Sequence, residues 1–123
     1  MSRFAAVLLT GLLATGCAAA DPGRPASTTA SGDAAAIVIE VRIADGSVRP
    51  VDARRDARVG EPVELVVDSD TEDEIHVHGT PEHTFRVAAA PAQRFQFTVA
   101  VPGRVEVELH RADRTVVTLL VRA

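Results

Sequence analysis

The chain has 123 residues and contains 13 arginines and no lysine against 17 acidic residues, which gives a formal net charge of −4 at pH 7. This acidic balance, without a basic stripe, speaks against nucleic acid as a partner and against attraction to an anionic membrane surface. With four phenylalanines and no tryptophan or tyrosine, a stacking platform for bases or sugars is not expected. The single cysteine excludes a disulfide within the chain, so packing must provide the stability.

The N-terminus has the pattern of a secretory signal. An apolar run follows Arg3 and ends in small residues, which predicts a signal peptide over residues 1–16 that is too short to span a bilayer. The segment Leu13-Ala14-Thr15-Gly16-Cys17 resembles the lipobox of bacterial lipoproteins, which implies cleavage before Cys17 and a thioether-linked lipid on its sulfur. The alternative is an ordinary cleaved signal with an incidental cysteine. We therefore expect an extracytoplasmic protein that is lipid-anchored to the cell membrane.

The next segment has the composition of a linker. Residues 17–34 are small, polar and rich in proline, glycine, serine and threonine, so we expect a lipidated N-terminus followed by a flexible tether. Residues 35–123 remain for one small domain, which buries about 60–65% of the surface of its unfolded chain.

Apolar and polar residues alternate with a period of two through most of this domain, as they do in half-buried strands. Turn residues such as Asp45-Gly46 and Pro102-Gly103 separate the strands. Residues 51–58 are rich in arginine and aspartate and are typical of an edge strand or a loop. The last strand is apolar on both faces, so we expect it to be central. The pattern predicts an all-β sandwich or barrel, with strands at 37–44, 63–68, 94–99, 104–109 and 116–121.

All four histidines lie in the domain, and two of them form a His-x-His pair. Residues two apart in a strand point to the same face, about 6.5–7 Å apart, so His76 and His78 can converge on one metal ion while Ile75 and Val77 face the core. Imidazole ligands favour copper, zinc or nickel over calcium or magnesium. The alternative is that the pair is simply polar surface.

The other chemistry-bearing residues are less specific. His110 ends a strand on the side opposite its apolar residues, and His83 follows a Gly/Pro turn and is interpreted as a loop residue. The acidic run 68–74 lacks the glycine and the distal glutamate of a calcium loop, so it is interpreted as a solvated turn.

The order of these signals resembles one known family. The quoted segments are residues 37–44, Gly46, Pro50, Val59–Val67, Glu74-Ile75-His76-Val77-His78 and Val101–Leu109. They are similar to the cupredoxin-like domain, in particular that of small actinobacterial lipoproteins with an Asp-Glu-(Ile/Val)-His-Val-His-Gly segment. The resemblance covers about Ile37 to Val121 and implies a cupredoxin-like Greek-key β-sandwich.

The copper ligands of that family are matched only in part. Cupredoxins bind type-1 copper through an early histidine and a late cysteine-histidine-methionine cluster. Either His76 or His78 matches the early histidine, but Leu109 stands at the cysteine position, His110 follows it, and the mature chain has no methionine. Because a blue-copper site needs the thiolate, electron transfer of that kind is not expected.

Three hypotheses follow for the function. The first is a non-enzymatic module that binds Cu(II) or Zn(II) through His76 and His78, with or without His110. The second is a metal-free interaction module that contacts another protein of the cell envelope. The third is a cupin-type metalloenzyme, because His76, His78 and Glu82 partly fit the His-x-His-x(3)-Glu motif, although the flanking glycines of that motif are missing. Whether Glu82 or His83 joins a site is left open by the sequence.

Overall fold

The computed structural model describes residues 35–123, so the expected signal peptide, Cys17 and the linker lie outside the described residues. Within that range, no helix is long and apolar enough to cross a membrane. The described residues form strands at Ile37–Ala44 (β1), Ser47–Arg49 (β2), Ala53–Arg58 (β3), Val63–Ser69 (β4), Asp73–Val77 (β5), His83–Val87 (β6), Gln93–Phe97 (β7), Gly103–Leu109 (β8) and Arg114–Arg122 (β9).

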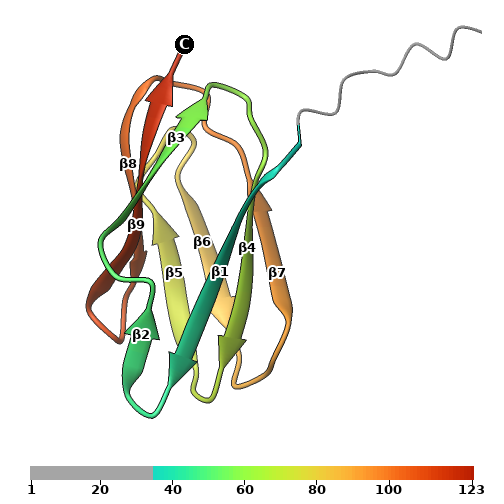
Figure 1. Cartoon of the computed structure of the whole chain (residues 1–123), viewed down its shortest axis with the longest axis vertical. Helices are drawn as coiled ribbons and strands as arrows, with labels where there is room; N and C mark the ends of the chain where they lie inside the picture. The colour runs from blue at the N-terminus through green and yellow to red at the C-terminus, as the bar shows by residue number, and fades with distance from the viewer. Residues whose placement is uncertain (1–34) are drawn as a thin grey trace, which may run out of the picture.

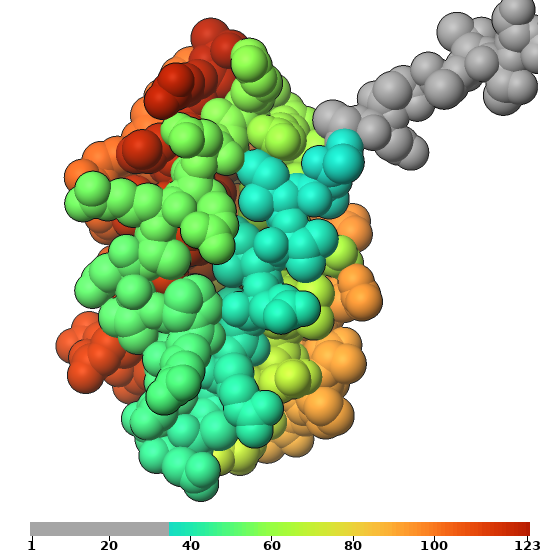
Figure 2. Space-filling view, in the orientation of Figure 1, coloured from blue at the N-terminus to red at the C-terminus, as the bar shows by residue number. Residues whose placement is uncertain are grey.

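The strands form two facing sheets (Figure 1). One sheet has the order β2-β1-β4-β7, and the other has the order β3-β9-β8-β5-β6. Both sheets are mixed, because β1 pairs with β4 and β3 pairs with β9 in parallel, while the other pairings are antiparallel. The connection from β2 to β3, coloured green in Figure 2, passes from the first sheet to the second along the outside of the molecule.

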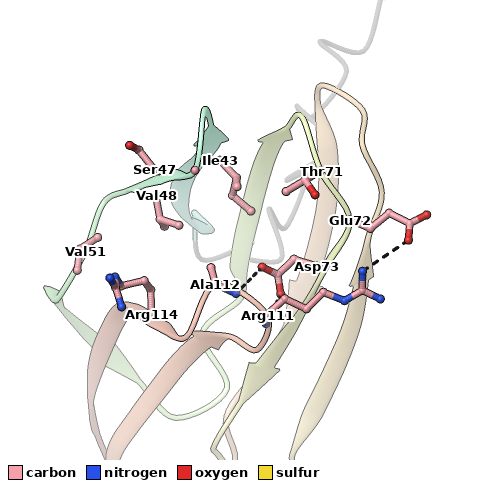
Figure 3. Close-up of a pocket in the computed structure, with 11 residues that line it drawn as sticks. Ile43, Ser47, Val48, Val51, Thr71, Glu72, Asp73, Arg111, Ala112 and Arg114 are labelled. Carbon is pink, nitrogen blue, oxygen red and sulfur yellow. Dashed lines mark hydrogen bonds and ion pairs between the residues drawn. The ribbon is translucent and has the colours of Figure 1, made fainter.

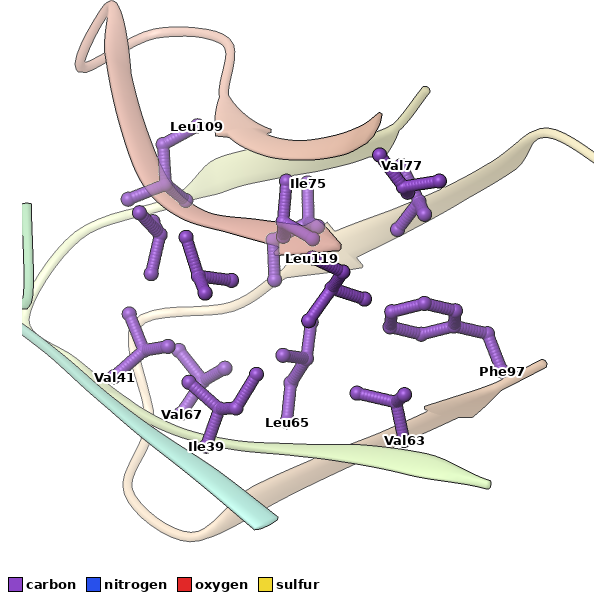
Figure 4. Packing of buried hydrophobic residues seen from close by; sticks show 14 of the residues in the cluster. Ile39, Val41, Val63, Leu65, Val67, Ile75, Val77, Phe97, Leu109 and Leu119 are labelled. Carbon is purple, nitrogen blue, oxygen red and sulfur yellow. The ribbon is translucent and has the colours of Figure 1, made fainter. Parts of the chain in front are cut away.

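The core lies between the sheets and consists almost entirely of branched aliphatic side chains (Figure 4). Leu65 of β4 and Leu119 of β9 are fully buried and approach each other from opposite sheets. Every second residue of β4, β5 and β8 is buried, so the alternation in the sequence is the alternation between core and solvent.

Most of the predicted strands are confirmed, with a few differences. β9 lies between β3 and β8, as its two apolar faces predicted, and residues 53–58 form an edge strand. The sequence did not predict β2 and β6 as strands. β2 has only three residues, and β6 reads His83-Thr84-Phe85-Arg86-Val87, with only Val87 fully buried. Such short or polar edge strands carry little periodic signal.

The core arrangement predicts a large effect of truncation at Leu65. Leu65→Ala should lower the free energy of unfolding by about 2–5 kcal/mol, because it removes buried methyl groups and leaves a cavity between the sheets. The matched control is Val38→Ala in the neighbouring strand, where the side chain is 53% exposed, and the expected change is within about 0.5 kcal/mol. Urea unfolding followed by circular dichroism measures both. Equal effects of the two substitutions would contradict this packing.

Candidate functional site

The outward face of β5 carries a row of polar side chains. Ile75 and Val77 are buried in the core, so Glu74 and His76 face the solvent side of the sheet, and His78 follows at its end. This confirms the predicted orientation of the apolar and histidine positions. The neighbouring strands place Thr84 of β6 and Glu108 of β8 directly opposite His76.

Two carboxylates hold the histidines of the His-x-His pair. Nε2 of His76 lies 2.6 Å from Oε1 of Glu74, and Nε2 of His78 lies 2.9 Å from Oε2 of Glu108. An ionised carboxylate can only accept a hydrogen bond, so Nε2 carries the proton in each pair. A neutral ring of this tautomer leaves the lone pair on Nδ1. Both histidines therefore have the carboxylate partner that metal-bound histidines commonly use to fix the ring.

His110 joins the same cluster from the end of β8. Its backbone N–H donates to the carbonyl oxygen of Glu74 over 2.9 Å. Its ring stacks on that of His76, with centroids 5.3 Å apart and planes 12° apart. The rings of His76 and His78 are 6.1 Å apart and tilted by 47°. The structure thus brings three of the four histidines together on one exposed face, which we call the histidine face: Glu74, His76, His78, Glu108 and His110.

Asp73 fixes the turn that carries His110. Its buried carboxylate accepts the backbone N–H groups of Glu74, Arg111 and Ala112 over 2.7, 2.8 and 3.1 Å. Figure 3 shows this carboxylate beside Ala112, with Arg111 and Glu72 paired on the outside. The interpretation of residues 68–74 as a solvated turn was therefore wrong at both ends, because Asp68 and Ser69 belong to β4 and Asp73 and Glu74 to β5. Asp73 is also buried, and three backbone donors compensate for its burial.

Two hollows border this turn. The larger, about 520 Å³, opens at the end of the sandwich between β2 and the β8–β9 turn (Figure 3). The smaller, about 320 Å³, is polar and lies beside His110, where Glu74, Arg86 and Arg111 also line it. Arg86 stands opposite Glu74 in the β5–β6 pairing. The histidine face therefore continues into a charged hollow rather than into an apolar one.

The remaining sequence candidates lie elsewhere. His83 belongs to β6, so its interpretation as a loop residue was wrong. It stacks on Phe85 with ring centroids 5.9 Å apart and planes 4° apart. Glu82 is exposed in the β5–β6 connection, and no hydrogen bond or ion pair joins it to a histidine within residues 35–123. The carboxylates that reach the histidines are those of Glu74 and Glu108.

Neither carboxylate was predicted from the sequence as a partner of the histidines. Glu74 was detectable in principle, because it is two residues before His76 and must share its face. Glu108 was not, because its position opposite His76 depends on which strands pair and in which register. No local pattern in the sequence gives that register.

The histidine face is not a completed metal site as it stands. Within the part of the chain that the structure describes, no group of three or more His, Cys, Asp or Glu side chains is arranged to hold an ion. The rings of His76 and His110 are nearly parallel, and the lone pairs lie in the ring planes. In this orientation the two rings do not point at one ion. Two imidazoles on one zinc ion have centroids at most about 6.5 Å apart, since Zn–N bonds are about 2.0–2.1 Å. The 6.1 Å between the ring centroids of His76 and His78 is within that limit but exceeds the roughly 5.2 Å of a tetrahedral N–Zn–N angle, so the two side chains must move closer together as well as rotate to share one ion.

A type-1 copper centre does not fit these residues. Residues 35–123 contain no cysteine, and Leu109, which the sequence resemblance matches to the thiolate position, has its side chain buried in the core against β5. A hydrocarbon side chain offers no donor atom to a metal. Any ion on this domain must therefore be held by imidazole and carboxylate groups.

The hydrogen bond to His76 also changes the acidity of Glu74. The Nε2–H donor of His76 lowers the pKa of the Glu74 carboxyl below its ordinary value, and the charges of His76, His110 and Arg86 act in the same direction, against a smaller opposing effect of desolvation. On the opposite sheet, the hydrogen bond from Arg94 lowers the pKa of Glu64 in the same way.

Among known proteins, solved structures of low sequence identity are similar to this chain. No family model matches the chain, and no curated protein matches its sequence. An oxidised proline-to-glycine variant of the cupredoxin amicyanin is 18% identical over 78% of this chain and 88% of that chain, with a TM-score of 0.48. A methionine-to-alanine variant in its Cu(I) form is 17% identical over 71% and 82% of the two chains, with a TM-score of 0.46. The two facing mixed sheets of the described domain confirm the predicted all-β sandwich, and both TM-scores are below 0.5.

Removing the imidazole of His76 should raise the pKa of the Glu74 carboxyl. In His76→Ala the pKa of Glu74 should rise toward its ordinary value, because the main cause of its depression is gone. In the intact protein the folded-state pKa is the lower one, so the stabilising contribution of the pair is present above the unfolded-state pKa and is lost as the pH falls through the folded-state pKa. Carboxyl ¹³C NMR titration of the metal-free protein measures it. His83→Ala is the control, and the same Glu74 pKa in both variants would refute the pairing.

Proposed function

We propose that this protein is a membrane-anchored, extracytoplasmic metal-binding module that holds Cu(II) or Zn(II) through His76 and His78, with His110 beside them. The observation that carries the proposal is the clustering of three imidazoles on one exposed sheet face, two of them held through Nε2 by carboxylates. A histidine that is only part of a polar surface needs neither neighbouring imidazoles nor a carboxylate partner. The proposed role is metal handling at the cell surface, without enzymatic chemistry and without blue-copper electron transfer.

The chemistry of the donors supports copper or zinc over harder cations. Neutral imidazole suits these metals, whereas calcium and magnesium take oxygen ligands. The carboxylates of Glu74 and Glu108 accept hydrogen bonds from Nε2–H of His76 and His78. The lone pair on Nδ1 of each neutral ring is then the one available to a metal. The negative charges of Glu74 and Glu108 also offset part of the positive charge of a divalent ion. The lipid on Cys17 and the membrane location belong to the same proposal and rest on the N-terminal sequence alone.

A second candidate function is a metal-free interaction module of the cell envelope. It is favoured by the carboxylate partners of His76 and His78, because side chains of the protein satisfy Nε2 of both rings. In that case the histidine face, with its mixture of acidic and imidazole groups, contacts a protein partner directly. The two functions differ in whether metal binding is stoichiometric.

Metal titration decides between them. The sample is the mature chain, residues 17–123, with Cys17→Ser to remove the predicted lipidation site and the only thiol. Calorimetric titration with Zn(II) and Cu(II) should show a saturable tight site, and His76→Ala or His78→Ala should weaken it by at least about 100-fold, since loss of an outer-shell partner alone costs 10–100-fold.

The chain offers two matched controls. His83→Ala removes a histidine outside the histidine face, and Glu82→Gln removes the carboxylate that the cupin alternative requires; neither should change the affinity. Equal, weak binding by all variants would refute the metal-binding proposal and leave the interaction module. A loss of affinity in Glu82→Gln would support the cupin-type site instead.

A further inference from the structure

One chain supplies too few convergent donors to satisfy a zinc ion. Zinc in proteins is almost always four-coordinate and tetrahedral. The rings of His76 and His78 share one sheet face and are tilted by 47° to each other, whereas the ring of His110 lies nearly parallel to that of His76. Within residues 35–123, no third donor is arranged with them around an ion. The donor set of a single copy is therefore half of a tetrahedral site.

The missing donors cannot come from the core side of the same sheet. The histidine face lies on the outside of the five-stranded sheet, and the residues behind it, Ile75, Val77 and Val107, are fully buried hydrocarbon. The side chain of His78 is 46% exposed, and that of Glu108 is 38% exposed. Another molecule can therefore approach the face directly.

We infer that a zinc ion joins two copies of this chain, with His76 and His78 of each copy as its four ligands. This inference rests on the proposed metal-binding function and adds to it the partner and the coordination. A two-fold interface uses the same patch on both copies, so two ligands per copy make a complete tetrahedral set. His110 acts in this arrangement as a positioning residue, because its ring stacks on that of His76 and supports it on the histidine face.

The charges on the face make the assembly dependent on metal. The outward side chains of β5 and β8 include three carboxylates, those of Glu74, Glu106 and Glu108, and one cation, Arg104, which pairs with Glu106. Two copies placed face to face bring these groups together, and like charges oppose the contact. A divalent ion between the imidazoles offsets part of that repulsion. We therefore expect no association of these faces without metal.

The placement of the N-terminus is compatible with this assembly on one membrane. β1 begins at Ile37, at one end of the sandwich, and the strands run along the long axis of the molecule (Figure 1). A two-fold axis parallel to the strands leaves both copies of Ile37 at the same end. Both copies can then be anchored by their N-terminal lipids to the same membrane.

Analytical ultracentrifugation with Zn(II) tests the inference on the mature chain with Cys17→Ser. The metal-free protein should sediment as a monomer, saturating Zn(II) should convert it to a dimer containing one ion per two chains, and a chelator should reverse the change. His78→Ala should abolish the dimer, and His110→Ala should shift the zinc dependence of dimerisation to higher concentration. His83→Ala should behave as the parent protein, and circular dichroism verifies that each variant is folded.

The outcomes separate this inference from the proposed function. A monomer that binds one zinc ion per chain would overturn the metal-joined dimer and leave the metal-binding proposal intact. No zinc binding would overturn the metal-joined dimer, and no binding of either Zn(II) or Cu(II) would overturn both. A dimer that persists in chelator, or in folded His78→Ala, would show that the contact does not depend on these ligands and would also overturn the inference.

Discussion

The alternation of buried and exposed residues along β5 is the constraint on which the rest of the site depends. Ile75 and Val77 are fully buried between the sheets, so the chain has no freedom to turn Glu74, His76 and His78 away from solvent. A shift of the strand by one residue would place two imidazoles and a carboxylate in the core at great cost. The same aliphatic packing that stabilises the sandwich therefore sets the positions of the metal-binding candidates.

A second contact, made by Asp73, connects the core to the cluster. The carboxylate of Asp73 is buried at the start of β5 and accepts backbone N–H groups from the β8–β9 turn. That turn carries His110, whose backbone also bonds to Glu74, so two hydrogen-bonded links fix the end of β8 against β5. The stacking of His110 on His76 follows from this backbone arrangement. In a small domain without disulfides, such a buried and fully paired carboxylate specifies one turn conformation out of many.

The parts of the fold and the site that the sequence could predict are those governed by local periodicity. The long alternating strands, the central position of β9 and the outward orientation of His76 all follow from the period of two. The short strand β2 and the polar edge strand β6 do not, because neither has enough buried positions to show a period. The pairing of His78 with Glu108 and the burial of Asp73 depend on contacts between residues 30 or more positions apart. Such contacts are set by strand order and register, which a single sequence does not display.

The central claim is that three particular imidazoles act as one unit on the outside of the sandwich. Long-range ¹H–¹⁵N NMR of the histidine side chains tests it most directly, because the ring nitrogens report both the tautomer and the metal. We predict the Nε2–H tautomer for His76 and His78 without metal. On addition of Zn(II), the Nδ1 resonances of these two rings should shift together, with a smaller change at His110 and none at His83. Absence of these shifts, or equal shifts at all four histidines, would contradict the account.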